Sequence, residues 1–218
     1  MVKSCLYSVL RLLFSDNSMS LLRPSALNGD QIRIQGRRVL LRPPVLGDYD
    51  EWAALREKSR DFLVPWEPIW PADDLTRPAF KRRLKRYAQD MREDLGYALF
   101  IFRLEDQALI GGLTLSNIRR GVTQSCSLGY WTGQPFSGQG YMREAARCIV
   151  PFVFEQLGLH RLEAACVPNN EPSKAVLRHA GFQQEGLARR YLRINGVWQD
   201  HLLFALVESD LAARQPRL

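Results

Sequence analysis

The chain has 218 residues, a length typical of one domain with a short extension at either end. Its 46% hydrophobic and 24% charged residues are enough for a sizeable core, which excludes a wholly disordered or low-complexity chain. The formal net charge of +7 favours acidic partners such as nucleic acid or phosphorylated ligands.

Cysteine spacing and hydropathy narrow the class of protein. Cys5, Cys126, Cys148 and Cys166 form no C-x-x-C pair, and the histidines lack metal-ligand spacing, so we expect a reduced cytoplasmic protein without metal. The longest mostly apolar stretch, residues 6–14, is far shorter than the about 20 residues that span a bilayer. We expect an extension over residues 1–30, in which Met19 is an alternative start, one domain over 31–213, and a tail over 214–218.

The first elements of the domain follow from local patterns. Residues 32–34 and 38–42 have the composition of strands. Asp48 and Glu51 have the spacing of a capping box, which predicts a helix over 49–60. Apolar residues at helical spacing over 80–95 predict an amphipathic helix.

The outward face of that second helix is basic. Residues 75–95 contain seven basic and three acidic residues, which gives +4 of the total charge. Two interpretations stay open: a solvated helix face, or docking on an acidic partner such as nucleic acid through Arg82, Lys85 and Arg86.

The second half of the chain alternates strands and helices. Three strand-like runs predict an antiparallel meander over 97–104, 109–118 and 126–132. The remaining predicted elements are helices over 142–157 and 170–180, closed by Gly158 and Gly181, and strands over 160–167, 182–190 and 197–207. This order predicts an α/β or α+β protein in which a helix separates the fourth and fifth main strands.

The junction at residues 128–145 has the character of an anion site. A strand leads through a loop containing Gly138 and Gly140 directly into a helix, and free N–H groups at a helix start attract phosphate oxygens. A Walker A loop is excluded because no lysine follows either glycine, and a Rossmann fingerprint is excluded because Arg143 stands where its third glycine or alanine belongs.

The loop instead resembles the acyl-CoA loop, R/Q-x-x-G-x-G/A, of the GNAT superfamily of N-acetyltransferases. Pro135 occupies its first position, and Gln134 lies one residue early. Residues 159–182, with Asn170 and Ser173 in an Asn-x-x-Ser helix start, resemble the RimJ/RimL-like group of ribosomal-protein N-terminal acetyltransferases. Further segments that resemble this group are 65–68 (Pro-Trp-Glu-Pro), 185–186 and 191–201.

The resemblance implies a GNAT fold: a mixed, twisted, mostly antiparallel sheet that is splayed in the middle, with helices on both faces. It also implies acetyl-CoA as co-substrate. Carried onto this chain, the main-chain and side-chain contacts to CoA would come from Trp131, Thr132, Ser137, Gly138, Gln139, Gly140, Tyr141, Met142, Asn170 and Ser173.

Two catalytic residues are implied. Ser173 would lie close to the CoA sulphur and help protonate the departing thiolate, whose pKa of about 8.5 makes it only mildly basic. Glu67 in the Pro-Trp-Glu-Pro segment is the first candidate for the base, with Glu171 and Asp200 behind it. Some members place a glutamate where this chain has Tyr191 and Leu192, so the base stays open.

The expected function is acetyl transfer to the α-amine of a protein, with an alanine N-terminus of a ribosomal protein as the leading acceptor. An α-amine with a pKa of about 7.8 is about one-tenth neutral at pH 7, so direct attack in a ternary complex needs only a weak base. The alternatives are acetylation of a small amine, such as a polyamine, amino acid or aminoglycoside, and a non-catalytic basic module that binds ribosomes or RNA. The sequence leaves a monomer and a dimer equally open.

Overall fold

The computed structural model describes residues 32–212, and the predicted N-terminal extension (1–30) and tail (214–218) lie outside the described residues. The strands are β1 Ile34–Gln35, β2 Val39–Arg42, β3 Tyr97–Arg103, β4 Leu109–Arg119, β5 Ser125–Thr132, β6 Arg161–Cys166, β7 Gln183–Ile194 and β8 Val197–Val207. The helices are α1 Tyr49–Lys58, α2 Arg60–Leu63, α3 Arg77–Arg92, α4 Tyr141–Pro151, α5 Glu171–Ala180 and α6 Glu208–Ala212.

All strands belong to one mixed, mostly antiparallel sheet with the order β1-β2-β3-β4-β5-β6-β8-β7. The predicted meander is confirmed, because β3, β4 and β5 are consecutive antiparallel neighbours. The parallel pair β5–β6 is connected through α4, as the predicted helix between the fourth and fifth main strands requires.

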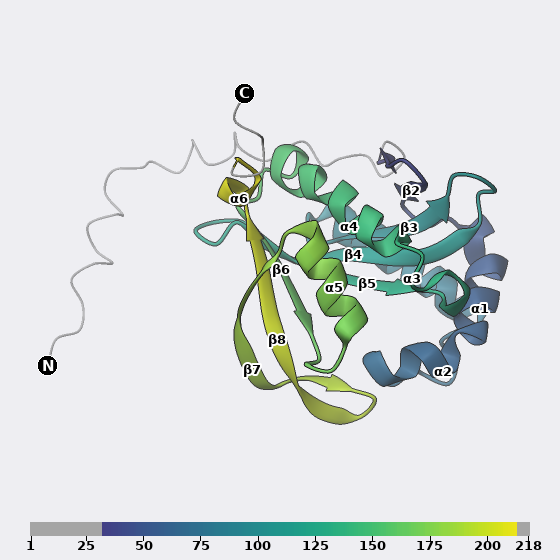
Figure 1. Cartoon of the computed structure of the whole chain (residues 1–218). Helices are drawn as coiled ribbons and strands as arrows, with labels where there is room; N and C mark the ends of the chain where they lie inside the picture. Colours follow the sequence, from purple (N-terminus) through teal and green to yellow (C-terminus); the bar gives the residue numbers. More distant parts are fainter. Residues whose placement is uncertain (1–31, 213–218) are drawn as a thin grey trace, which may run out of the picture.

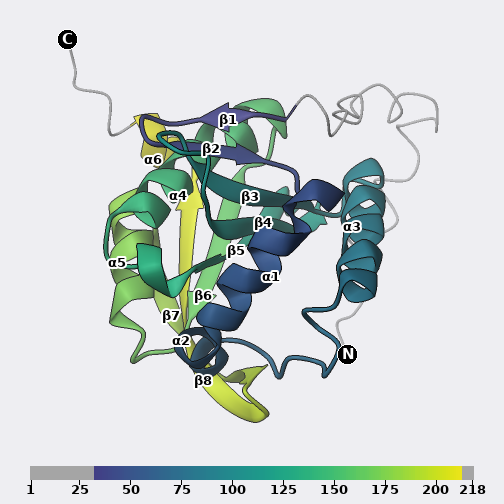
Figure 2. The same ribbon diagram turned by 90° about the vertical axis from the view of Figure 1, so that its right-hand side faces the viewer.

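Helices cover both faces of the sheet, as expected (Figures 1 and 2). One core cluster joins the α4 and α5 face to the sheet through residues such as Ile149, Leu162 and Leu177. A second cluster lies under α1 and α3 and includes Trp52, Phe80 and Phe100. Side chains alternate across a strand, so neighbouring residues of β5 belong to different faces.

The predicted capping box at the start of α1 is wrong. The Asp48 side chain makes no cap bond; its oxygens accept instead from both terminal nitrogens of Arg42, at 2.8 and 2.7 Å, and from Val45 N. Glu51 accepts from Leu109 N at 2.6 Å and thereby joins α1 to β4. Both carboxylates serve tertiary contacts that local spacing does not reveal.

The helix predicted over 142–157 changes its geometry part-way. α4 ends at Pro151, and residues Phe152–Gln156 form a π-helical turn in which Leu157 N donates to Phe152 O at 2.9 Å. Pro151 lacks an N–H and cannot make the α-helical bond back to Arg147 O, and the π-helical turn begins directly after it. Gly158 then closes the segment with a φ of +59°, as predicted.

Candidate functional site

The parallel seam between β5 and β6 is short. It runs from Ser125 paired with Arg161 to Leu128 paired with Ala164 and ends there. Beyond it β5 continues to Thr132 paired with β4 alone, and β6 continues to Cys166 paired with β8 alone. The two facing margins therefore carry backbone groups without a strand partner, which is the splay that the sequence resemblance implied.

The glycine loop lies at the end of the β5 margin. Gly138 and Gly140 have φ values of +76° and +83°, and α4 starts directly after Gly140, which is its N-cap. Glycine adopts positive φ without strain, and the free N–H groups of the first turn face outward from the helix start. The side chains of Tyr141 and Met142 are buried, so these residues can contact a ligand in the loop chiefly through the backbone.

Arg38 holds this loop in place, a role that the sequence did not reveal. Its Nε donates to Glu144 Oε2 at 3.0 Å and its Nη1 to Gln139 O at 3.3 Å. The guanidinium also lies over the Tyr141 ring, 4.7 Å from the centroid. The turn between β1 and β2 is thereby joined to the start of α4.

Ser173 lies across the gap from β5. The Tyr130 hydroxyl is 2.8 Å from Ser173 Oγ and 3.3 Å from Ser173 O. Asn170 Oδ1 accepts from Ser173 N at 3.0 Å, which confirms Asn170 as the N-cap of α5. Burial raises the pKa of Tyr130 well above its usual range, so the phenol keeps its proton and is able to donate it in a hydrogen bond. Tyr130 was missed because only its contact with Ser173 distinguishes it from a core tyrosine.

Cys166 ends β6 beside this pair. Burial raises the pKa of its thiol, with a smaller opposing effect from Ser173. A buried neutral thiol is a poor nucleophile, because the thiolate is the reactive form. Among residues 32–212 there are three free cysteines, Cys126, Cys148 and Cys166, and burial raises the pKa of each thiol.

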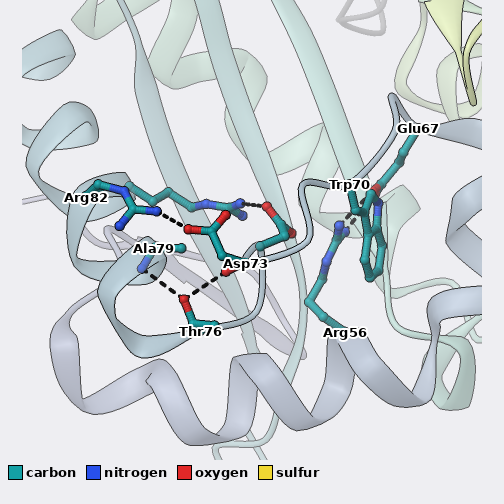
Figure 3. Close-up of polar contacts among 9 residues, drawn as sticks. Arg56, Glu67, Trp70, Asp73, Thr76, Ala79 and Arg82 are labelled. Atoms are coloured by element: carbon teal, nitrogen blue, oxygen red, sulfur yellow. Dashed lines mark hydrogen bonds and ion pairs between the residues drawn. The ribbon is translucent and has the colours of Figure 1, made fainter.

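Glu67 lies on the face of the sheet that α1 and α3 cover, opposite to the face covered by α4 and α5. It is paired with the buried Arg56 (Figure 3). Its two oxygens accept from Arg56 Nη1 and Nη2 at 2.7 and 2.6 Å, and Oε2 also accepts from Trp70 Nε1 at 2.7 Å. The guanidinium is stacked between the rings of Trp70 and Trp131, at 4.0 and 5.0 Å from their centroids. A carboxylate has about four lone-pair positions, so one position on Oε1 is left.

The two other candidate bases are also engaged. Glu171 forms an ion pair with Lys174 one turn further along α5, and its side chain is largely exposed. Asp200 Oδ1 accepts from Arg190 N at 2.8 Å. Neither lies among the residues that bridge the gap between β5 and β6.

The basic face of α3 is partly neutralised by acidic residues outside the helix. Arg82 pairs with Asp73 (Figure 3), Arg83 with Asp74, and Arg77 with Asp50. These aspartates lie outside residues 75–95, the segment whose net charge is +4. The basic residues of α3 without an ion pair among residues 32–212 are Lys81, Lys85, Arg86 and Arg92.

The structure thus brings most of the predicted CoA contacts to one region: Trp131 and Thr132 on the β5 margin, residues 137–142 in the loop, and Asn170 and Ser173 across the gap. The Trp131 side chain itself belongs to the α1 face, so its contact to a ligand in the gap would be through the main chain. Arg56 was missed because nothing in its local sequence distinguishes it from an exposed helix arginine.

No group of three or more His, Cys, Asp or Glu side chains within residues 32–212 is arranged to hold a metal ion. Within the same range, no helix is both long and apolar enough to cross a membrane.

Comparison with known proteins places this arrangement in a family. The model of the Acetyltransferase (GNAT) domain matches residues 38–183. The chain is 36% identical to the probable N-acetyltransferase YjcK of Bacillus subtilis, over 81% of the chain and 98% of that protein. It is 31% identical to the [ribosomal protein uS5]-alanine N-acetyltransferase of Escherichia coli, over 84% of the chain and 94% of that protein.

Solved structures agree. The ribosomal-protein-S5-alanine acetyltransferase of Vibrio fischeri superposes with a TM-score of 0.76 at 30% identity, covering 82% of this chain and 98% of that one. RimJ of Mycobacterium smegmatis, solved in complex with CoA-disulfide, also has a TM-score of 0.76, at 32% identity, covering 82% and 84%. The chain belongs to the GNAT family of acetyl-CoA-dependent N-acetyltransferases, close to the RimJ/RimL-type ribosomal-protein N-acetyltransferases.

Proposed function

We propose that the enzyme transfers the acetyl group of acetyl-CoA to the N-terminal α-amine of a protein, with an alanine N-terminus of a ribosomal protein as the leading acceptor. The observation that carries this proposal is the gap between β5 and β6, which has the glycine loop at one end and the Tyr130–Ser173 pair across it. The choice of an alanine N-terminus as acceptor is supported by the similarity of this chain to the [ribosomal protein uS5]-alanine N-acetyltransferase, which extends over 94% of that protein.

The proposed acetyl-CoA site uses the facing margins of the gap. The pantetheine arm would bond the main chain of Trp131 and Thr132 and the Asn170 side chain, and the pyrophosphate would lie on the N–H groups of residues 137–142. The positive φ of both glycines and the free N–H groups at the start of α4 support this assignment.

The proposed reaction is direct attack in a ternary complex. The neutral amine nitrogen bonds to the thioester carbonyl carbon, the C–S bond breaks, the amine loses one proton, and the thiolate gains one. Ser173 would give its hydroxyl proton to the sulphur and recover one from water. The raised pKa of the Cys166 thiol supports a path without an acetylated enzyme.

Glu67 stays the proposed base, acting through water. Its remaining lone pair on Oε1 and the 21% exposure of its side chain leave room for one water or the acceptor ammonium. A carboxylate is a weak base, and a weak base suffices for an α-amine that is about one-tenth neutral at pH 7.

Turnover on matched acceptors tests the function. A peptide with a free alanine or serine N-terminus is expected to be acetylated, whereas the same peptide with a blocked N-terminus, spermidine and free lysine are not. Acetylation of the small amines with no turnover on peptides would show that the acceptor assignment is wrong. CoA binding by thermal shift without any turnover would favour the non-catalytic module, and a burst of acetylated enzyme with acetyl-CoA alone would exclude direct transfer.

We further propose that α3 docks on ribosomal RNA, which agrees with a cytoplasmic location. Because Arg82 is paired with Asp73, the decisive residues are Lys85 and Arg86. The double variant Lys85→Glu/Arg86→Glu is expected to lose activity on ribosomal particles, with a weaker dependence on salt than the wild type shows, and to keep activity on free peptide. If the variant and the wild type are equally active on ribosomal particles, the docking proposal is wrong and the basic side of α3 is a solvated helix face.

A further inference from the structure

Arg56 carries a buried guanidinium that lies beside the gap. The residue is 5% exposed, and its guanidinium lies 5.0 Å from the centroid of the Trp131 ring, while the main chain of Trp131 belongs to the β5 margin. The Trp70 ring covers the guanidinium at 4.0 Å. Within residues 32–212, Arg56 Nε is the one buried side-chain nitrogen or oxygen without a hydrogen-bond partner, so the hydrogen bonds of the guanidinium all go to Glu67.

This guanidinium balances the charge of Glu67. Arg56 Nη1 and Nη2 donate to the two oxygens of Glu67, at 2.7 and 2.6 Å, and a bidentate pair of this kind has no net charge. The side chains of the pair are 6% and 21% exposed, so solvent and salt screen it little. An amine that reaches the open lone-pair position on Glu67 Oε1 therefore meets a carboxylate whose charge is already neutralised.

A second guanidinium on the same ring provides a comparison. Arg60 lies over Trp70 at 4.9 Å and is paired with Glu57 at 2.6 Å. The side chains of Arg60 and Glu57 are 44% and 61% exposed, so water screens this pair. Arg60 has no contact with Glu67 among the hydrogen bonds and ion pairs of residues 32–212, and its charge does not balance that carboxylate.

The net charge at Glu67 affects which form of an amine is bound. An α-amine is about one-tenth neutral at pH 7, whereas a lysine amine, or the similar primary amine of a polyamine, is neutral in less than about one molecule in a thousand. An unpaired carboxylate attracts the ammonium form, which cannot attack the thioester. A neutralised carboxylate gives the ammonium form no such advantage.

We propose that Arg56 determines the class of acceptor by acting through Glu67. Because Arg56 neutralises this carboxylate, the site favours the neutral α-amine of a peptide over lysine side chains and polyamines, which are ammonium ions at neutral pH. Arg56 is thus a positioning and specificity-determining residue, and it does not itself touch the reacting atoms. The inference rests on the proposed function, in which Glu67 faces the acceptor amine.

Binding of two peptides to the full chain in the presence of CoA, which permits no acetyl transfer, tests this inference. One peptide has a free alanine N-terminus, and the other has a hydroxyl in place of the α-amine and is neutral. Wild-type protein at pH 7 is expected to bind the neutral peptide at least as tightly as the amine peptide. Arg56→Met is expected to reverse this preference and bind the amine peptide about fivefold or more tightly than the neutral one, because the unpaired carboxylate makes a charge-assisted hydrogen bond to the ammonium. Its affinity for spermidine should rise by a similar factor.

Two variants separate the charge of Arg56 from other effects. Arg56→Lys keeps the charge without the bidentate geometry and should keep the wild-type preference within about twofold. Arg60→Met removes the same charge from the other guanidinium over Trp70 and should keep that preference as well. Thermal melts check that each variant is folded. The wild-type measurement requires no variant, so it tests the inference even if Arg56→Met does not fold.

The outcomes distinguish this inference from the proposed function. A wild-type protein that binds the amine peptide more than about twofold more tightly than the neutral peptide overturns the role of Arg56 and leaves the peptide acceptor intact. An unchanged preference in folded Arg56→Met, or the same reversal in Arg60→Met, overturns it too. Binding of neither peptide to the wild-type protein overturns the peptide acceptor and the inference together.

Discussion

Replacing Ser173 with alanine is expected to slow acetyl transfer much more than it weakens acetyl-CoA binding. The Tyr130 hydroxyl, kept protonated by burial, lies 2.8 Å from Ser173 Oγ. In the proposed relay Tyr130 is the donor of this pair, which leaves the serine proton free to point at the sulphur. In Ser173→Ala the proton donor is lost. In Tyr130→Phe the serine remains, but nothing fixes the direction of its hydroxyl.

The size of each effect follows from these contacts. General acid catalysis contributes about 10²- to 10⁴-fold, and a thiolate of pKa about 8.5 belongs at the low end, so kcat of Ser173→Ala should fall about 100-fold. A neutral hydrogen bond contributes about 1 kcal/mol, so Tyr130→Phe should lower kcat about 5-fold. The kcat of the double variant Ser173→Ala/Tyr130→Phe should fall about 100-fold rather than about 500-fold, because Tyr130 acts only through Ser173.

Steady-state kinetics with direct quantification of the acetylated peptide measures kcat and the KM for acetyl-CoA in each variant. Tyr87→Phe on α3 is the matched control, because the Tyr87 hydroxyl makes no hydrogen bond with any residue between 32 and 212. Thermal melts check that the variants stay folded. A Ser173→Ala enzyme within twofold of wild type, or a double variant whose loss is the product of the single losses, would refute the relay from Tyr130 through Ser173.

Three further predictions concern the supports of the site. Gly140→Ala forces an alanine to a φ of +83° and should destabilise the fold by about 1–2 kcal/mol in urea unfolding and weaken CoA binding, whereas Gly47→Ala, with open space around it, should do neither. Glu67→Gln leaves the buried Arg56 charge unpaired and should lower the free energy of unfolding by about 3 kcal/mol; a change below about 1 kcal/mol would show that the pair is not structural. Burial would raise the pKa of Glu144, but its bonds to Arg38 outweigh this and lower it, so the pair stabilises the fold above pH about 4.3 and loses this effect as the pH falls through the folded-state pKa. Wild-type protein should therefore exceed Glu144→Gln in stability at pH 7, and the difference should vanish at acidic pH.

Periodic and glycine-bounded elements could be predicted from the sequence. The meander, the long α4 stripe and the glycine loop follow from alternation, helical spacing and positive-φ positions, which are properties of neighbouring residues. Asn170 at the start of α5 could be predicted for the same reason, since its bond to Ser173 N spans three residues.

Contacts between distant segments could not be predicted. Asp48 and Glu51 have the spacing of a capping box, yet Arg42 and Leu109 bind them instead. Arg38 reaches Glu144 across 106 positions of the chain, and Tyr130 reaches Ser173 across 43. The resemblance to relatives indicated where the site lies, but the residues that hold Ser173, Glu67 and the loop in place emerge only from the folded structure.

The short seam between β5 and β6 has a consequence for how the molecule opens. Within residues 32–212 the β5–β6 ladder, with four residue pairs, is the only strand pairing between the β1–β5 part of the sheet and the β6–β8 part, and both parts have separate further partners. A bound acetyl-CoA arm that contacts both margins acts as a bridging segment of the sheet. At 100 times its Kd it would stabilise the fold by about 2.7 kcal/mol. Amide hydrogen exchange should then slow together on Thr132 and on Val167, which lie on opposite sides of the gap, because the co-substrate would connect the two margins.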